Sequence, residues 1–185
     1  MPKGMYLICM SSEGFIYPSP QWAEAFCKAI NENQEYREAA KDWRWDVAFV
    51  ATSIPENVVD KLSEILGLPK PKDLGIKVDS GAIKLVLRNG TCQGSEFYID
   101  LPVNLPPEIK LPGNIRIGKV DADFVLEATY SLWKDLILGK ADAVSALLSR
   151  KIKVKKGSFL TLMQYSSAAV KLANTTRNVP TKFID

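Results

Sequence analysis

Three carboxylates lie close together at Asp121, Asp123 and Glu127, and their types and spacing could serve chemistry. A cluster of this kind can bind a divalent cation or exchange protons with a substrate. The odd-numbered spacing places all three on one face of an expected strand, where acidic side chains are ordinarily solvated or paired with lysines. The structural role is therefore the favoured interpretation, and we expect no metal ion here.

A second segment, Gly113–Lys119, has glycines and a lysine at the spacing of a phosphate-binding loop. The residue that follows the lysine is Val120, whereas such loops need serine or threonine there to bind magnesium. Alternation around Arg116 also indicates a strand rather than a loop of converging amides. Nucleotide binding at this segment is therefore not expected.

The composition argues against several functional classes. The sequence has no histidine, which removes the commonest general base and metal ligand. A net charge of +3 is too small to indicate a nucleic-acid partner. Cys9, Cys27 and Cys92 are far apart and form no Cys-x-x-Cys pair, so neither a zinc site nor a disulfide framework is indicated. We expect a cytoplasmic protein that is not an enzyme and has no cofactor.

Capping and turn residues predict the elements that would carry these side chains. Ser19 and Pro20 are typical of a helix start, and Trp22 and Phe26 then fall on one apolar stripe. The pair Asn89-Gly90 predicts a tight hairpin between two strands of the middle region. Gly81 interrupts the alternation of the first of these strands and predicts a bulge there.

The last third reads as strand, helix, helix, strand, helix. Thr129 or Ser131 can cap the first helix, and Gly139 ends it. Lys151–Lys155 alternates lysine with β-branched residues, as an edge strand does when lysines protect its open side. Gly157-Ser158 then precedes one final helix. The order predicts an α+β fold with a five-stranded, mainly antiparallel sheet covered by helices and an N-terminal helical extension.

The block Leu138–Asp142, followed by the strand Ile152–Gly157, resembles the sterol carrier protein family of lipid-transfer domains. The family shows a Gly-Lys-x-Asp turn between two short helices and then a "Gly-Lys-Ile-Lys-Val-x-Gly" strand before a terminal helix. Here Arg150 replaces the glycine that precedes the strand. We interpret 1–18 as a leader or edge segment and 19–185 as one sterol carrier protein-like domain, with the core of the resemblance at about 45–173.

This resemblance implies an internal apolar tunnel for a fatty acyl chain, a sterol or a related lipid, with no catalysis and no cofactor. The candidate wall residues are apolar and lie on the inward faces of the expected elements. They are Phe124, Leu126, Leu132, Trp133, Leu136, Ile137, Leu147, Leu148, Phe159, Leu162 and Met163.

A basic run beside this tunnel could contact an anionic membrane surface, through Arg150, Lys151, Lys153, Lys155 and Lys156. Protection of the sheet edge explains the same residues. Two alternatives to a lipid carrier stay open. The first is an interaction or dimerisation module of the same fold with a closed core, and a homodimer is one form of it. The second, less favoured, is an enzyme that uses carboxylates and lysines alone.

Overall fold

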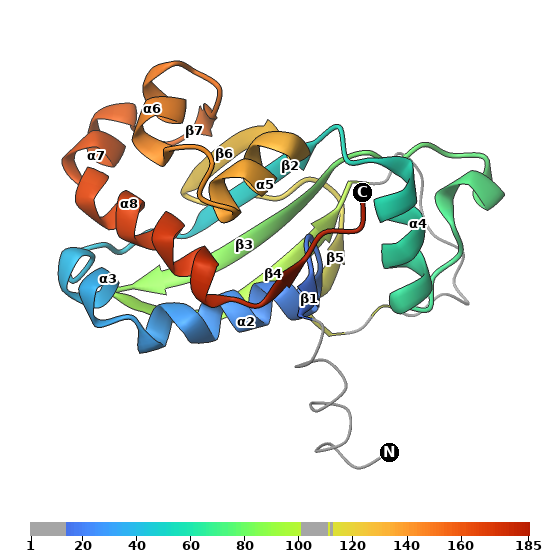
Figure 1. Cartoon of the computed structure of the whole chain (residues 1–185), viewed down its shortest axis with the longest axis horizontal. Helices are drawn as coiled ribbons and strands as arrows, with labels where there is room; N and C mark the ends of the chain where they lie inside the picture. Colours follow the sequence, from blue (N-terminus) through green and yellow to red (C-terminus); the bar gives the residue numbers. More distant parts are fainter. Residues whose placement is uncertain (1–13, 101–110, 112) are drawn as a thin grey trace, which may run out of the picture.

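The computed structural model describes residues 14–100, 111 and 113–185. The described strands of its main sheet are β2 (Val47–Thr52), β3 (Gly81–Arg88), β4 (Thr91–Ile99), β5 (Ile115–Ile117), β6 (Phe124–Thr129) and β7 (Lys153–Lys156). They are arranged in the order β5-β4-β3-β2-β6-β7 (Figure 1). Two further short strands, β1 (Phe15–Ile16) and β8 (Thr181–Lys182), pair in parallel and bring the two ends of the described chain together.

The α+β class is as expected, but the prediction of a five-stranded, mainly antiparallel sheet was wrong. The described sheet has six strands and is mixed, because β6 runs parallel to β2 and β5 runs parallel to β4. A parallel pair needs a long crossover, and a whole helix and a hairpin separate β2 from β6. Local sequence patterns do not reveal such a pairing.

The hairpin between β3 and β4 turns at Asn89 and Gly90, which have φ values of 51° and 82°. These positive angles confirm the predicted tight turn. The bulge expected at Gly81 was wrong, since Gly81 pairs with Ile99 in regular register. The register shift lies instead between Val86 and Leu87, close to the turn.

Seven described helices accompany this sheet, and five of them begin at a residue whose side chain caps the helix. They are α2 (Pro20–Glu32), α3 (Gln34–Ala39), α4 (Glu56–Ile65), α5 (Tyr130–Ile137), α6 (Ala143–Leu148), α7 (Phe159–Gln164) and α8 (Ser166–Thr175), with short 3-10 turns at Pro71–Leu74 and Thr176–Asn178. The hydroxyl of Ser19 accepts a hydrogen bond from the backbone N–H of Trp22 (3.0 Å), and that of Thr129 accepts one from Leu132 (3.2 Å). Both caps confirm the prediction. The single final helix does not occur, because the chain breaks at Tyr165 into α7 and α8.

The helices cover the sheet and enclose the core. Helix α2 packs against β3 and β4, and α5 packs against β2 and β6. Helix α8 contacts α2, α3, α5, α6 and α7, so it lies across the other helices (Figure 1). A partly buried hydrogen-bond chain holds its C-terminal end, because Asn33 Nδ2 donates to Thr175 Oγ1 (2.7 Å), which donates to the carbonyl of Lys171 (2.7 Å).

A disulfide joins Cys27 of α2 to Cys92 of β4 across 65 residues of sequence. The expectation that the cysteines form no disulfide was therefore wrong, because the packing of α2 along β4 brings together two residues that are distant in sequence. Asn31 reinforces this link, since its side chain donates to the carbonyl of Cys92 (2.9 Å) and accepts from its N–H (2.7 Å). Cys9 lies outside the described residues.

The segment interpreted as a leader or edge, residues 1–18, is described only from Gly14. In that part, Phe15 and Ile16 pair with β8, and Tyr17 is buried. Within the described ranges, the helices are all too short or too polar to cross a membrane.

Candidate functional site

An apolar cavity of about 120 Å³ lies between the sheet and the helices. The sheet side is formed by aliphatic and aromatic side chains that alternate along three central strands, namely Val47, Phe49, Ile83, Leu87 and Leu126. Because successive strand residues point to opposite faces, this alternation places the apolar set inside.

The opposite side of the cavity is formed by helices and their connections from both halves of the chain. The N-terminal half contributes Tyr17, Trp22, Phe26, Tyr36 and Trp43. The C-terminal half contributes Trp133, Leu136, Ile137, Ala143, Leu147, Ile152, Leu162, Tyr165, Ala168, Ala169, Leu172, Ala173 and Thr176. Large aromatic rings therefore dominate one side, whereas α8 presents mainly alanine.

Each indole around the cavity donates its N–H to the protein. Trp22 Nε1 donates to Thr181 Oγ1 (2.9 Å), Trp43 Nε1 to the carbonyl of Trp45 (2.7 Å), and Trp133 Nε1 to the carbonyl of Val50 (2.8 Å). The hydroxyl of Thr176 likewise donates to the carbonyl of Ala173 (2.6 Å). These polar groups are satisfied, so a ligand in the cavity does not need to pair with them.

Two phenols on the cavity wall are held in their neutral form. Desolvation by burial, with a smaller contribution from Tyr130, raises the pKa of Tyr17 far above its usual value. Burial also raises the pKa of Tyr36. Among the described lining residues, no side chain carries a charge at neutral pH. The arrangement is suited to removing apolar surface from water, and it contains no acid–base pair for catalysis.

Six of the eleven wall residues predicted from the sequence line this cavity. They are Leu126, Trp133, Leu136, Ile137, Leu147 and Leu162. Five lie outside it. Phe124 is buried among Trp43 and Trp45, with ring centroids 5.0 and 5.9 Å away. Leu132 and Met163 are half-buried, whereas Leu148 and Phe159 are exposed. Contact with a ligand stays a prediction for all eleven.

The N-terminal part of the wall was not predicted from the sequence. The spacing of Trp22 and Phe26 predicts a helical stripe but does not show which strands that stripe faces. Val47 and Phe49 carried a clearer signal, because their alternation already predicted a strand with one buried face. The alanines of α8 carried no signal of a cavity in the sequence, since small residues on a helix are equally typical of close packing.

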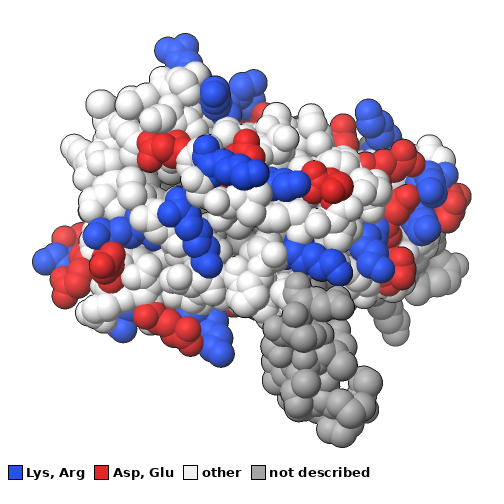
Figure 2. Space-filling view, viewed as in Figure 1, with Lys and Arg blue, Asp and Glu red and all other residues white. Residues whose placement is uncertain are grey.

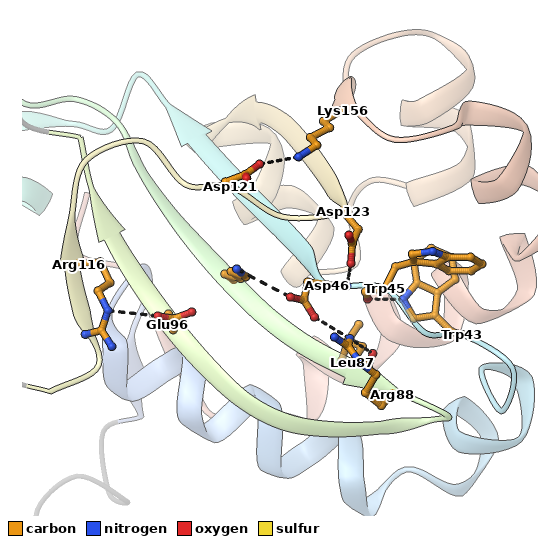
Figure 3. A network of polar contacts seen from close by, with 11 residues as sticks. Trp43, Trp45, Asp46, Leu87, Arg88, Glu96, Arg116, Asp121, Asp123 and Lys156 are labelled. Carbon is orange, nitrogen blue, oxygen red and sulfur yellow. Dashed lines mark hydrogen bonds and ion pairs between the residues drawn. The ribbon is translucent and has the colours of Figure 1, made fainter.

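Asp121, Asp123 and Glu127 do not line the cavity, and Asp121 and Asp123 belong to a network of ion pairs and hydrogen bonds (Figure 3). Asp121 pairs with Lys156 (2.7 Å), and this hydrogen bond lowers the pKa of the Asp121 carboxyl. Asp123 accepts a hydrogen bond from the backbone N–H of Asp46 (2.9 Å), and Asp46 pairs with Arg88. No group of His, Cys, Asp and Glu that could hold a metal occurs in the described ranges. The structural interpretation of these acids is confirmed for Asp121.

The glycine-containing segment 113–119 and the lysine-rich segment 151–155 both form strands of the main sheet. The segment spaced like a phosphate-binding loop forms β5 at Ile115–Ile117, as its alternation indicated. The lysine-rich segment forms β7 at the edge of the sheet, where Lys153, Lys155 and Lys156 are exposed. Arg150, which stands where the family has glycine, has a φ of 62°. The glycine preference at that position is therefore explained, because the backbone there is left-handed.

The cavity is smaller than a lipid tunnel. Pockets for drug-sized ligands are roughly 300–1,000 Å³, whereas this one is about 120 Å³. An open tunnel is therefore not seen among the residues that the structure describes. A long apolar chain could enter only if some of the surrounding helices move outward.

Solved structures similar to this chain include sterol carrier proteins. A crystal structure of sterol carrier protein 2 is 27% identical, has a TM-score of 0.61, and aligns over 87% of this chain and 97% of its own. The solution structure of a conserved hypothetical protein of Thermus thermophilus, suggested to be a sterol carrier protein, is 26% identical with a TM-score of 0.63 and coverages of 89% and 90%. Sterol carrier protein 2 of Yarrowia lipolytica in its apo form is 16% identical, with a TM-score of 0.41 and coverages of 84% and 89%.

No family model and no curated protein matches the sequence. The first two structures nevertheless align over 87% and 89% of this chain. They confirm that this chain contains a sterol carrier protein 2-like domain.

Proposed function

We propose that this sterol carrier protein 2-like domain binds a lipid or another long apolar molecule non-covalently and transfers it between membranes or proteins. The ligand would be fatty acyl or sterol-like. The observation that carries the proposal is the internal cavity whose described lining is apolar and uncharged. The names of the similar structures support it. The proposed role is binding without catalysis.

The driving force would be the removal of apolar surface from water. Each methylene group that enters the cavity contributes about 0.8 kcal/mol. Since the space of about 120 Å³ is small, binding also requires the cavity to widen. Helix α8 would move outward at its start, because its cavity side is formed mostly by alanines, whose side chains are small.

The eleven residues predicted from the sequence are part of this proposal in two groups. The six that line the cavity would contact ligand directly. The other five form the second group, in which Phe124, Leu132 and Met163 would contact ligand only in a widened form. Leu148 and Phe159, which are exposed, would face solvent and would not contact it. The exposed basic residues Arg150, Lys151, Lys153, Lys155 and Lys156 would bring the carrier to anionic membranes, where it takes up or releases its cargo.

Extraction of the purified protein followed by lipid analysis, with native mass spectrometry, tests this proposal. A stoichiometric apolar ligand should accompany the protein, and a fluorescent fatty acid should bind to the delipidated protein.

Neighbouring residues provide a matched pair of variants. Leu147 lines the cavity and is 4% exposed, whereas the next residue, Leu148, is 62% exposed. Leu147→Trp should weaken binding of the fluorescent fatty acid about tenfold or more, since the indole occupies most of a cavity of this size. Leu148→Trp should leave it unchanged. Equal affinity in both variants would move the binding site away from this cavity.

The small cavity also favours one alternative, a closed-core interaction module that forms a homodimer. If no ligand accompanies the protein and the fluorescent fatty acid does not bind, the carrier proposal fails. Sedimentation of the same sample as a dimer would then support the module.

A further inference from the structure

Helices α6 and α7 expose large apolar side chains at one end of the molecule. Leu148, at the end of α6, is 62% exposed, and Phe159 and Leu160, at the start of α7, are 40% and 74% exposed. Single exposed apolar residues are ordinary on protein surfaces. These three are different because they lie on two consecutive helices joined only by β7 and its short connections.

Cationic side chains accompany these apolar residues. Arg150, Lys151, Lys153 and Lys155 are all exposed and lie in the connection from α6 and in β7, between Leu148 and Phe159. Lys156 differs from them, since it pairs with Asp121. Figure 2 shows lysine and arginine side chains gathered above α6 and β7, beside an uncharged surface over α6 and α7. Exposed apolar groups with cations between them along the chain are typical of surfaces that bind at the bilayer interface.

The same two helices also form part of the cavity wall. Leu147 of α6 faces the cavity while Leu148 faces solvent. In α7, Leu162 faces the cavity, whereas Leu160 faces solvent. Only one layer of short helix therefore separates the exposed apolar residues from the cavity interior.

We propose that α6, β7 and α7 form a membrane-docking surface, in which Leu148, Phe159 and Leu160 enter an anionic bilayer while Arg150, Lys151, Lys153 and Lys155 contact its headgroups. This inference rests on the proposed carrier function, because the docking surface is useful to a carrier whose cavity lies directly behind the docked helices. Cargo then passes between α6 and α7 without crossing water. The proposed partner is an anionic lipid surface rather than a protein. Its hydrocarbon region would accept the apolar side chains, and its headgroups would pair with the cations.

Sedimentation of the delipidated full chain with vesicles tests this inference. We expect binding to vesicles of phosphatidylcholine with phosphatidylserine, and weak binding to phosphatidylcholine alone. Replacement of Leu148 and Leu160 by Gln together should reduce binding to the anionic vesicles about tenfold or more. Lys151→Gln, Lys153→Gln and Lys155→Gln together should reduce it by a similar factor or more and should remove its salt dependence.

Matched controls use similar residues at other places. Leu74 and Leu138 are exposed leucines outside these elements, and Leu74→Gln with Leu138→Gln should retain binding. Lys28, Lys41 and Lys77 are exposed lysines elsewhere, and their replacement by Gln together tests whether total charge alone matters. Equal losses in the control and test variants would overturn the docking surface.

The outcomes separate this inference from the proposed function. The test variants should still bind the fluorescent fatty acid in solution as the unaltered chain does. If the fatty acid binds but the chain ignores anionic vesicles, the docking surface is wrong and the carrier stands. If vesicles bind but no fatty acid does, the carrier is wrong and the surface stands. If Leu148→Gln with Leu160→Gln abolishes self-association instead of vesicle binding, the surface faces a second copy and the inference is overturned.

Discussion

The cavity is bounded by two regions that are held in different ways. The N-terminal wall, α2 and α3, is cross-linked to the sheet by Cys27–Cys92 and by both hydrogen bonds of Asn31. The C-terminal cover, α6 to α8 with β7, has short helices and exposed apolar residues, and an edge strand as its sheet component. Its partly buried polar anchor, Asn33 to Thr175, lies at the C-terminal end of α8.

This difference indicates where the cavity can change its size. Movement of the N-terminal wall would require a covalent bond to be strained or broken. Movement of α6, α7 and the start of α8 requires only the loss of apolar contacts. The proposed carrier would need one fixed surface that keeps the fold and one surface that moves to admit a ligand, and these two regions would supply them.

Removal of the disulfide should produce the largest effect on the N-terminal wall. Cys27→Ala with Cys92→Ala should lower the free energy of unfolding by about 2–5 kcal/mol, because a cross-link over a long loop restricts the unfolded chain. Denaturant unfolding checks this. The unaltered chain under reducing conditions should behave like the double variant, and equal stability of oxidised and reduced protein would show that the wall is not held covalently.

A methyl group at Gly157 should disturb the attachment of the C-terminal cover. Gly157 has a φ of 102°, and a Cβ there would overlap the ring of Phe124. Gly157→Ala should therefore cost about 2–4 kcal/mol, from overpacking and from left-handed strain together. Thermal unfolding measures the loss. Gly94→Ala is the control, because a Cβ at Gly94 meets no atom within 4 Å. A second change, Phe124→Leu, should recover part of the loss in the Gly157→Ala chain.

A larger side chain on α8 should fill the cavity from the side of the C-terminal cover. Ala169→Leu adds three carbons to a space of about 120 Å³, and we expect fatty-acid affinity to fall about tenfold because the cover then has less room to accept cargo. Titration with the fluorescent fatty acid checks this. Ser167→Leu, at an exposed position of the same helix, should retain affinity. Unchanged affinity in the Ala169 variant would show that the cover moves far enough to make this volume irrelevant.

The smallest expected effect concerns the entry to β7. Arg150 has a φ of 62°, in the region that favours glycine. Arg150→Gly should raise the free energy of unfolding by up to about 1 kcal/mol, since glycine adopts this backbone without strain. Ser149→Gly, a neighbouring position with a φ of −83°, is the control and should not stabilise the chain. A destabilised Arg150→Gly chain would mean that the arginine side chain makes a contact worth more than the strain.

Much of the local structure could be predicted from the sequence. The caps at Ser19 and Thr129, the turn at Asn89-Gly90 and the lysine-protected edge strand all depend on residues close together in the chain. The resemblance of the last third to sterol carrier proteins also followed from short motifs, and similar solved structures confirm it. The candidate cavity was predicted only on its C-terminal side.

The rest depended on how distant segments meet. The disulfide between Cys27 and Cys92, the parallel pairing of β2 with β6 and the aromatic N-terminal wall each join residues far apart in sequence. The solvent exposure of Leu148 and Phe159 was decided in the same way, because both carry the apolar character expected of wall residues. Side-chain type and spacing determine which faces are apolar, since they act within a few residues. Only the tertiary structure decides which of those faces enclose a cavity and which remain outside, because that choice depends on the packing of the whole chain.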